Sequence, residues 1–387
     1  MPAPTYLFYG IQLSLYAGKV RAYLRKKGLR FLERETSHPG FAVASEGLPF
    51  PKQPLIETPE GEVVQDTTEI IDFLEARHPE RSVYPDGPVQ RLVGLILELY
   101  GDEGLMKPAM HYRWAFPDRN DTFLREEFGR SFRTSPSEHA AGLAAADGLL
   151  GFMRSQVVPA LGVTPESGPA IEAAYEELLD ALEAHFRLHP YLLGGRPSIG
   201  DFGMIAPLYG HLGRDPVPLE LMKSRAPACH RWVERMNVAD AGLAEFPDTV
   251  EDYLPDDEVP ASLFPILRLM AEDYLPELLG IVSSVNDWLG AQPPLPPGTR
   301  FPASTQTMGT RSPIGTHRVK LRGVEIEIAV QHYTIWMLQR VLDHYADLEP
   351  VARGRANAIL EETGLMPLVQ ASPMRRIERE NFIEVLR

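Results

Sequence analysis

The order of patterns in the first eighty residues limits the possible folds more than any other feature of the chain. An apolar aromatic stretch is followed by an amphipathic helical stretch, a second short apolar stretch, a Pro/Gly-rich loop, a hairpin pattern and another helical stretch. These segments fall at residues 5–9, 14–28, 31–35, 38–52, 55–64 and 66–78. Short strands alternating with helices predict a small α/β domain with a mixed sheet over residues 1–85.

The remainder of the chain has a different character. Residues 89–250 show long helical patterns without strand periodicity, which predicts an all-helical domain. Residues 255–260 have the composition of a linker. Residues 260–387 are predicted to form a mostly helical extension that contains a Pro/Gly-rich loop and resumes as helix near Val324.

The charge and the cysteine content of the chain argue against a nucleic-acid-binding, membrane or disulfide-bonded protein. The 387 residues carry a formal net charge of −15, which disfavours nucleic acid and anionic membrane surfaces as partners. We see no apolar run long enough to span a bilayer and no signal-peptide pattern at the start. The single cysteine, Cys229, excludes a disulfide within the chain. A reducing, cytoplasmic compartment is therefore expected.

Ser14 stands where the first predicted helix begins. A serine there is a good helix N-cap, because its hydroxyl satisfies a free backbone N–H group, and this structural explanation is the more common one. The second explanation is functional. A hydroxyl and several free N–H groups at the positive end of a helix stabilise an anion such as a thiolate.

Two further pairs of residues also have two explanations. Gln53-Pro54 precedes a strand, either as an ordinary loop proline or as a cis proline that exposes the backbone of Gln53 to a ligand. Asp66-Thr67 opens a helix, where both residue types are common caps. An acidic side chain and a helix N-terminus would also hold the ammonium and the carboxylate of an amino acid.

In this order, the motifs resemble the glutathione transferase superfamily. SLYAGKVRAYL is similar to the family's first-helix motif, KQPLIETPEG to its cis-proline segment, and QDTTEIIDFLE to its Glu-Ser-x-x-Ile motif. YLLGGRPSIGDFGMIAPLYGHL resembles the family's buried helix, with a capping box formed by Ser198 and Asp201. The resemblance covers residues 5–240 and implies a thioredoxin-like domain followed by a helical domain.

The resemblance also implies a set of site residues. Ser14 takes the catalytic Ser/Cys position and donates a hydrogen bond to the sulfur of glutathione. The backbone at Gln53-Pro54, Asp66 and Thr67 then bind the tripeptide, and Lys52 reaches its glycine carboxylate or is simply a solvated loop lysine. Tyr9 is the alternative activating residue, or a core tyrosine.

This chain departs from the family pattern at several of these positions. Asp66 replaces the usual Glu, Thr67 replaces Ser, and Gln53 replaces an apolar residue. Ser14 and Ala17 occupy the two positions of a Cys-x-x-Cys motif, so dithiol redox chemistry is excluded.

The implied activity is attack of the glutathione thiolate on a small electrophile, with glutathione as co-substrate and no metal. A non-catalytic glutathione-binding or scaffold protein and a glutathione-dependent lyase or isomerase remain as alternatives. The family resemblance implies a homodimer. Tyr16, His111, Tyr112 and Trp114 are candidates for the electrophile pocket, although packing between helices explains such aromatic residues equally well.

A basic stretch near the C-terminus has two explanations. It contains no Asp or Glu and carries Arg300, Arg311, Arg318, Lys320 and Arg322. Such a stretch either forms a lid over an anionic ligand or docks on the acidic surface of the protein, and docking is the more common case.

Overall fold

The first eighty residues form one small mixed sheet with helices. The structure is a computed structural model, and it describes residues 5–301 and 314–387. The sheet order is β2-β1-β3-β4, with β1 parallel to β2 and antiparallel to β3. The elements are β1 (Tyr6–Tyr9), α1 (Leu15–Lys26), β2 (Phe31–Arg34), α2 (Pro39–Ala44), β3 (Leu55–Glu57), β4 (Val63–Gln65) and α3 (Thr67–Arg77). This is the predicted thioredoxin-like arrangement.

The second region is helical, as predicted. Its elements are α4 (Pro88–Leu99), the π-helical turn η1 (Tyr100–Gly104), α5 (Met106–Trp114), α6 (Pro117–Ser131), η2 (Pro136–Glu138), α7 (His139–Phe152), η3 (Met153–Val157), α8 (Val158–Ala160), α9 (Gly168–Phe186), α10 (Ile199–Gly210), α11 (Pro216–Arg225) and α12 (Pro227–Met236). Every residue of α10 except Tyr209 is buried. Helix α10 is therefore the core of this region, packed between α1 and α4.

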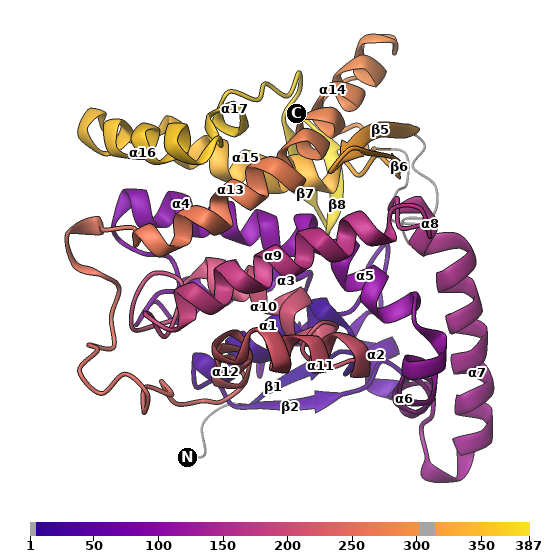
Figure 1. Cartoon of the computed structure of the whole chain (residues 1–387). Helices are drawn as coiled ribbons and strands as arrows, with labels where there is room; N and C mark the ends of the chain where they lie inside the picture. Colours follow the sequence, from indigo (N-terminus) through magenta and orange to yellow (C-terminus); the bar gives the residue numbers. More distant parts are fainter. Residues whose placement is uncertain (1–4, 302–313) are drawn as a thin grey trace.

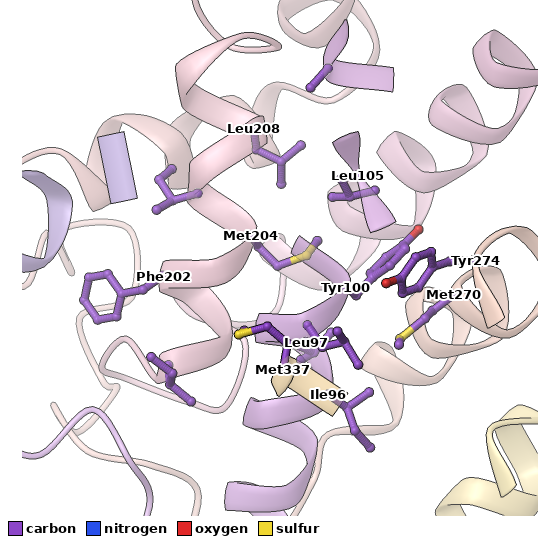
Figure 2. Close-up of a cluster of buried hydrophobic side chains, with 14 of the residues drawn as sticks. Ile96, Leu97, Tyr100, Leu105, Phe202, Met204, Leu208, Met270, Tyr274 and Met337 are labelled. Carbon is purple, nitrogen blue, oxygen red and sulfur yellow. The ribbon is translucent and has the colours of Figure 1, made fainter. Parts of the chain in front are cut away.

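The C-terminal extension joins the same core. Its elements are η4 (Pro255–Asp257), η5 (Ala261–Leu263), α13 (Phe264–Asp273), α14 (Leu275–Gly290), β5 (Thr316–Leu321), β6 (Val324–Ala329), α15 (Tyr333–Ala346), α16 (Pro350–Thr363), α17 (Met366–Val369), β7 (Ile377–Glu380) and β8 (Ile383–Leu386). In Figure 1 the extension, drawn in orange and yellow, lies on the opposite side of the helical region from the β1–β2 part of the sheet. Figure 2 shows Met337 of α15 and Tyr274 in one cluster with Leu97, Tyr100 and Met204.

Two predictions about local structure were wrong. The sequence from Val324 was expected to be helical, but it forms β6, and the helix α15 begins only at Tyr333. The alternation Val-Glu-Ile-Glu-Ile-Ala has the two-residue period of a strand, and Arg322 and Gly323, both with positive φ, form the tight turn from β5. Residues 38–52, expected to be a loop, contain the short helix α2.

The extension also contains a hairpin that the sequence did not predict. Strands β7 and β8 pair antiparallel, with Glu380 opposite Ile383. Part of the predicted Pro/Gly-rich loop, residues 302–313, lies outside the described residues. Within the described ranges, no helix combines the length and the apolar character needed to cross a membrane.

Candidate glutathione site

The register of the sheet brings the predicted site segments to one end of it. Tyr9 at the end of β1 lies opposite Leu55 at the start of β3, and Leu55 lies opposite Gln65 at the end of β4. The loop that follows Tyr9, the residues that precede Leu55 and the residues that follow Gln65 therefore share one edge. Helices α1 and α3 both begin at this edge, with the positive ends of their dipoles.

Ser14 is the N-cap of α1. Its Oγ accepts a hydrogen bond from the backbone N–H of Ala17 at 3.3 Å, and its backbone is extended, as an N-cap requires. The prediction that Ser14 is a helix N-cap is thus confirmed. The hydroxyl hydrogen has no acceptor among the described residues, so it remains available to a ligand.

Two arginines of the helical region, Arg113, which is buried, and Arg214, which is partly exposed, hold the loop before Ser14. Arg113 donates to the carbonyl of Leu13 at 2.8 Å, and Arg214 donates to the carbonyl of Gln12 at 2.6 Å. Arg113 also forms a two-point ion pair with Asp215, and both side chains are almost fully buried. Sequence reasoning missed this pair. Its only sequence signal was an arginine within an otherwise apolar and aromatic helical segment.

Gln53 explains one departure from the family pattern. Its side-chain oxygen accepts a hydrogen bond from the backbone N–H of Ile11 at 3.2 Å, which ties this segment to the loop before Ser14. The Gln53-Pro54 peptide bond is cis, as one of the two explanations required. No hydrogen bond to a described residue engages the backbone N–H or C=O of Gln53.

Asp66 caps α3 and is already engaged by the extension. Its backbone N–H donates to the carbonyl of Pro54 at 3.2 Å, and its side chain accepts from Thr68 at 3.3 Å. Tyr333 donates to Oδ1 of Asp66 at 3.0 Å, and Arg379 donates to Oδ2 at 3.3 Å. A cationic ligand that binds Asp66 therefore has to compete with the Tyr333 hydroxyl and the Arg379 guanidinium.

Thr67 and Lys52 lie beside Asp66. No described residue forms a hydrogen bond with the hydroxyl of Thr67 or with the ammonium of Lys52. Burial lowers the pKa of Lys52, and the carboxylates of Glu384 and Asp66 act in the opposite direction. These two side chains retain the capacity to bind a carboxylate.

Tyr16 faces an acidic cluster. Burial raises its pKa well above the usual value, and Glu103, Asp102 and Asp66 reinforce the shift. Burial also raises the pKa of Glu103 to about 8 and that of Asp102 to about 7. Asp102 is paired with the buried Lys19 at 2.5 Å, whereas Glu103 accepts a hydrogen bond from Thr334 at 2.6 Å.

The other aromatic candidates pack within the protein. The rings of Tyr112 and Phe116 are stacked, with centroids 5.8 Å apart, and Trp114 stacks on Phe128 at 6.2 Å. His111 pairs with Glu172 at 2.7 Å. All three candidates, His111, Tyr112 and Trp114, are about 95% buried, so their placement agrees with the packing explanation.

Tyr9, the alternative activating residue, is 1% exposed. Its ring packs against Phe41 of α2, with centroids 5.9 Å apart, and its hydroxyl accepts a hydrogen bond from Arg34 at 3.5 Å. These contacts are those of a core tyrosine at the end of a strand. Ser14 is therefore the better placed of the two hydroxyls.

Two residues of the basic stretch pair with acidic residues: Arg322 with residues of other elements, and Arg318 with a residue of the neighbouring strand β6. Arg322 pairs with Glu177 at 2.7 Å and with Asp273 at 2.8 Å, and Arg318 pairs with Glu327 at 3.1 Å. Arg311 lies outside the described residues. No group of three or more potential metal-ligating side chains occurs within residues 5–301 and 314–387.

Comparison with known proteins places these elements in a family. The N-terminal domain model of glutathione S-transferases matches residues 8–82, and the C-terminal domain model matches residues 165–235. No curated protein matches the chain.

Solved structures with a similar fold include the β-etherase LigF from Sphingobium, with 20% identity and a TM-score of 0.41 over 62% of this chain and 98% of that one. A glutathione transferase from Phanerochaete chrysosporium has 17% identity and a TM-score of 0.42, covering 61% of this chain and 97% of that one. A glutathione S-transferase from Methylobacterium radiotolerans, in complex with glutathione sulfonate, has 18% identity and a TM-score of 0.37, covering 65% of this chain and 99% of that one.

The N-terminal match contains Ser14, Gln53 and Asp66, and neither match reaches the extension that begins after the helical region. The chain therefore carries the N-terminal and the C-terminal domain of glutathione S-transferases, followed by a C-terminal extension that neither domain model covers.

Proposed function

We propose that this protein binds glutathione and activates its thiol for attack on a small electrophile. The observation that supports this most is the state of Ser14. It caps α1, and its hydroxyl hydrogen has no acceptor among the described residues. A thiolate placed there would accept this hydrogen bond and be stabilised by the dipole of a 12-residue helix.

The other groups at this edge suit a tripeptide. The unpaired backbone of Gln53 would bind the central residue as a strand pairs with a sheet edge. The Thr67 hydroxyl and the N-terminus of α3 would take the carboxylate of the γ-glutamyl group, and Asp66 its ammonium. Lys52 would take the glycine carboxylate, and Tyr16 would line the electrophile pocket.

The proposal is tested by measuring the ionisation of bound glutathione by ultraviolet absorbance as a function of pH. A free thiol has a pKa near ~8.5, and we expect the bound thiol to titrate about two units lower. Ser14→Ala should raise this bound pKa by about one unit and reduce kcat/KM by roughly tenfold, which corresponds to one lost hydrogen bond to a charged group.

Tyr9→Phe is the matched control, because it removes a hydroxyl from the same end of the sheet. It should leave both measurements unchanged. Full conjugating activity in Ser14→Ala would make the assignment of Ser14 wrong, and Tyr9 would become the next candidate.

A non-catalytic glutathione-binding or scaffold protein is the second candidate function. The engagement of Asp66 by Arg379 and Tyr333 favours it, because the proposed ammonium receptor is already occupied. Bound glutathione with an unshifted thiol pKa would support this function over catalysis. A lyase or isomerase would show a lowered thiol pKa but turnover only with the corresponding substrates of an electrophile panel. A homodimer and a cytoplasmic location belong to the proposal through family resemblance.

A further inference from the structure

The hairpin formed by β7 and β8 supplies a cation to the proposed ammonium receptor. Arg379 of β7 donates to Asp66 at 3.3 Å and to Glu69 at 2.5 Å, and both acidic residues lie at the start of α3. Tyr333 occupies the other carboxylate oxygen of Asp66 at 3.0 Å. Both oxygens of Asp66 thus have partners from the extension.

The same hairpin places an anion near the proposed carboxylate receptor. Glu384 of β8 accepts a hydrogen bond from Arg379 at 2.5 Å and is almost fully buried. Of the charged residues that act on Lys52, Glu384 has the largest influence on its pKa. The hairpin therefore presents a cation to Asp66 and an anion to the surroundings of Lys52, the two signs of charge that a zwitterionic peptide would present.

The position of Arg379 is fixed by packing. Its guanidinium lies 5.1 Å from the ring centroid of Tyr333 and 5.3 Å from that of Trp336, and it also donates to the carbonyl of Phe382 at 3.2 Å. Only 4% of its side chain is exposed. A side chain held this way is a built contact and not a chance surface pair.

The hairpin itself is a small unit. It has two strands of four residues each, and Gln339 of α15 bonds to the backbone of Ile377 in both directions, at 2.7 and 2.9 Å. Strand β8 is also anchored on its other side, because Gly298 donates to the carbonyl of Leu386 at 2.7 Å and Phe301 donates to that of Glu384 at 3.1 Å. Displacement of the hairpin from Asp66 therefore means the loss of the side-chain contacts of Arg379 and Tyr333, with the backbone of the hairpin held in place.

We propose that the β7–β8 hairpin is an intramolecular competitor for the glutathione site, which a ligand must displace from Asp66. This inference rests on the proposed function. The ammonium of the incoming peptide would replace the guanidinium of Arg379 at Asp66, so the acidic group keeps a cationic partner in both states. Affinity is reduced by the fraction of molecules in which the hairpin covers the site.

Titration calorimetry of the full chain with glutathione tests the competition. Arg379→Met keeps the length of the side chain and removes its charge, and we expect it to bind glutathione about tenfold more tightly than wild type. Tyr333→Phe removes one hydrogen bond with little change in packing, and we expect about threefold tighter binding. Arg376→Met is the matched control, because Arg376 lies beside the hairpin and pairs with Asp343 away from Asp66, and it should bind like wild type.

Weaker binding in both Arg379→Met and Tyr333→Phe would overturn the inference and make these residues direct ligand contacts. Unchanged binding in both would also overturn it, while leaving the proposed function in place. If wild type and all variants fail to bind glutathione, the proposed function is wrong. Whether the β7–β8 hairpin covers the site is then tested by a thiol-labelling experiment that needs no ligand.

That measurement uses the cysteine content of the chain. Cys229 is the only cysteine and is fully buried, and Thr67, directly beside Asp66, is only 4% exposed. The thiol of Thr67→Cys would therefore react only in molecules in which the site has opened. We expect N-ethylmaleimide to label Thr67→Cys about tenfold faster when Arg379→Met is also present, and no faster with Arg376→Met. Equal labelling rates in all three proteins would show that the hairpin does not control access, and the inference would be wrong.

Discussion

At the scale of single residues, Arg113 connects the helical region to the proposed catalytic serine. It donates to the carbonyls of Leu13 and Gly210 at 2.8 and 2.7 Å and pairs with Asp215, which has no exposed surface. Removing one partner of a buried ion pair leaves the other charge without compensation, which typically costs about 3–5 kcal/mol. The loop before Ser14 thus depends on a residue a hundred positions away in the sequence.

We therefore expect Arg113→Met to lower the free energy of unfolding by about 4 kcal/mol, measured by urea denaturation. The double variant Arg113→Met, Asp215→Asn should lose less, because the unpaired charge is gone. Arg119→Met is the control, since Arg119 forms a solvent-exposed pair with Glu220, and it should change stability by less than about 1 kcal/mol. A loss in Arg113→Met as small as that of the control would contradict the structural role assigned to Arg113.

At the scale of secondary-structure elements, the capping box of α10 organises the core of the helical region. The Asp201 carboxylate accepts hydrogen bonds from the backbone N–H and the hydroxyl of Ser198, both at 2.9 Å, and from Leu192 at 3.1 Å and Trp232 at 3.0 Å. All of these groups are buried. The predicted capping box at the N-terminus of α10 is confirmed. Asp201 also ties α12, through Trp232, and the loop before α10, through Leu192, to this helix.

Asp201→Ala should destabilise the protein by about 3 kcal/mol, since several buried donors lose their acceptor at once. Guanidinium denaturation followed by circular dichroism measures the loss. Ser135→Ala removes an exposed N-cap from the short helix η2 and should cost less than about 1 kcal/mol. If the two variants lost equal stability, the hydrogen bonds around Asp201 would contribute no more to stability than an ordinary helix N-cap.

At the scale of the whole molecule, buried acids collect where the extension meets the two domains. Burial raises the pKa of Glu69 to about 7, that of Asp102 to about 7 and that of Glu103 to about 8. Glu69 contacts Arg379 and Glu103 contacts Thr334, so two of these acids touch the extension directly. The folded protein therefore binds protons that the unfolded chain releases above about pH 5.

The sign of the pH dependence follows from this. A raised folded-state pKa stabilises the protein fully at low pH, and this contribution is lost as the pH rises through the folded-state value. We expect the free energy of unfolding to fall between about pH 5 and about pH 8, by at most about 1.4 kcal/mol per pH unit for each proton released, and to level off above the folded-state pKa of Glu103. Glu103→Gln keeps the acceptor for Thr334 but cannot ionise, so it should flatten this profile. An unchanged slope in Glu103→Gln would exclude Glu103 as the titrating group.

Local sequence determined the parts of this protein that depend on neighbouring residues. Ser14 at the start of α1, Asp66 at the start of α3 and the capping box of α10 were all predicted, because caps act over three or four residues. The order of strands and helices in the first eighty residues was predictable for the same reason. The β5–β6 hairpin was equally local in its two-residue alternation and its Gly323 turn, and it was missed because neighbouring apolar residues also fit a helical face.

Only the tertiary structure decided what covers the site. Arg379 reaches Asp66 across 313 positions of sequence, and Tyr333 reaches it across 267. Arg113 reaches Leu13 across 100. No spacing rule links residues this far apart, because their approach depends on how whole elements pack and not on the period of any helix or strand. The sequence by itself therefore determined that two helix N-termini suited to bind an anion lie at one edge of the sheet. The packing of the extension determined that Arg379 and Tyr333 of the same chain occupy the Asp66 carboxylate there.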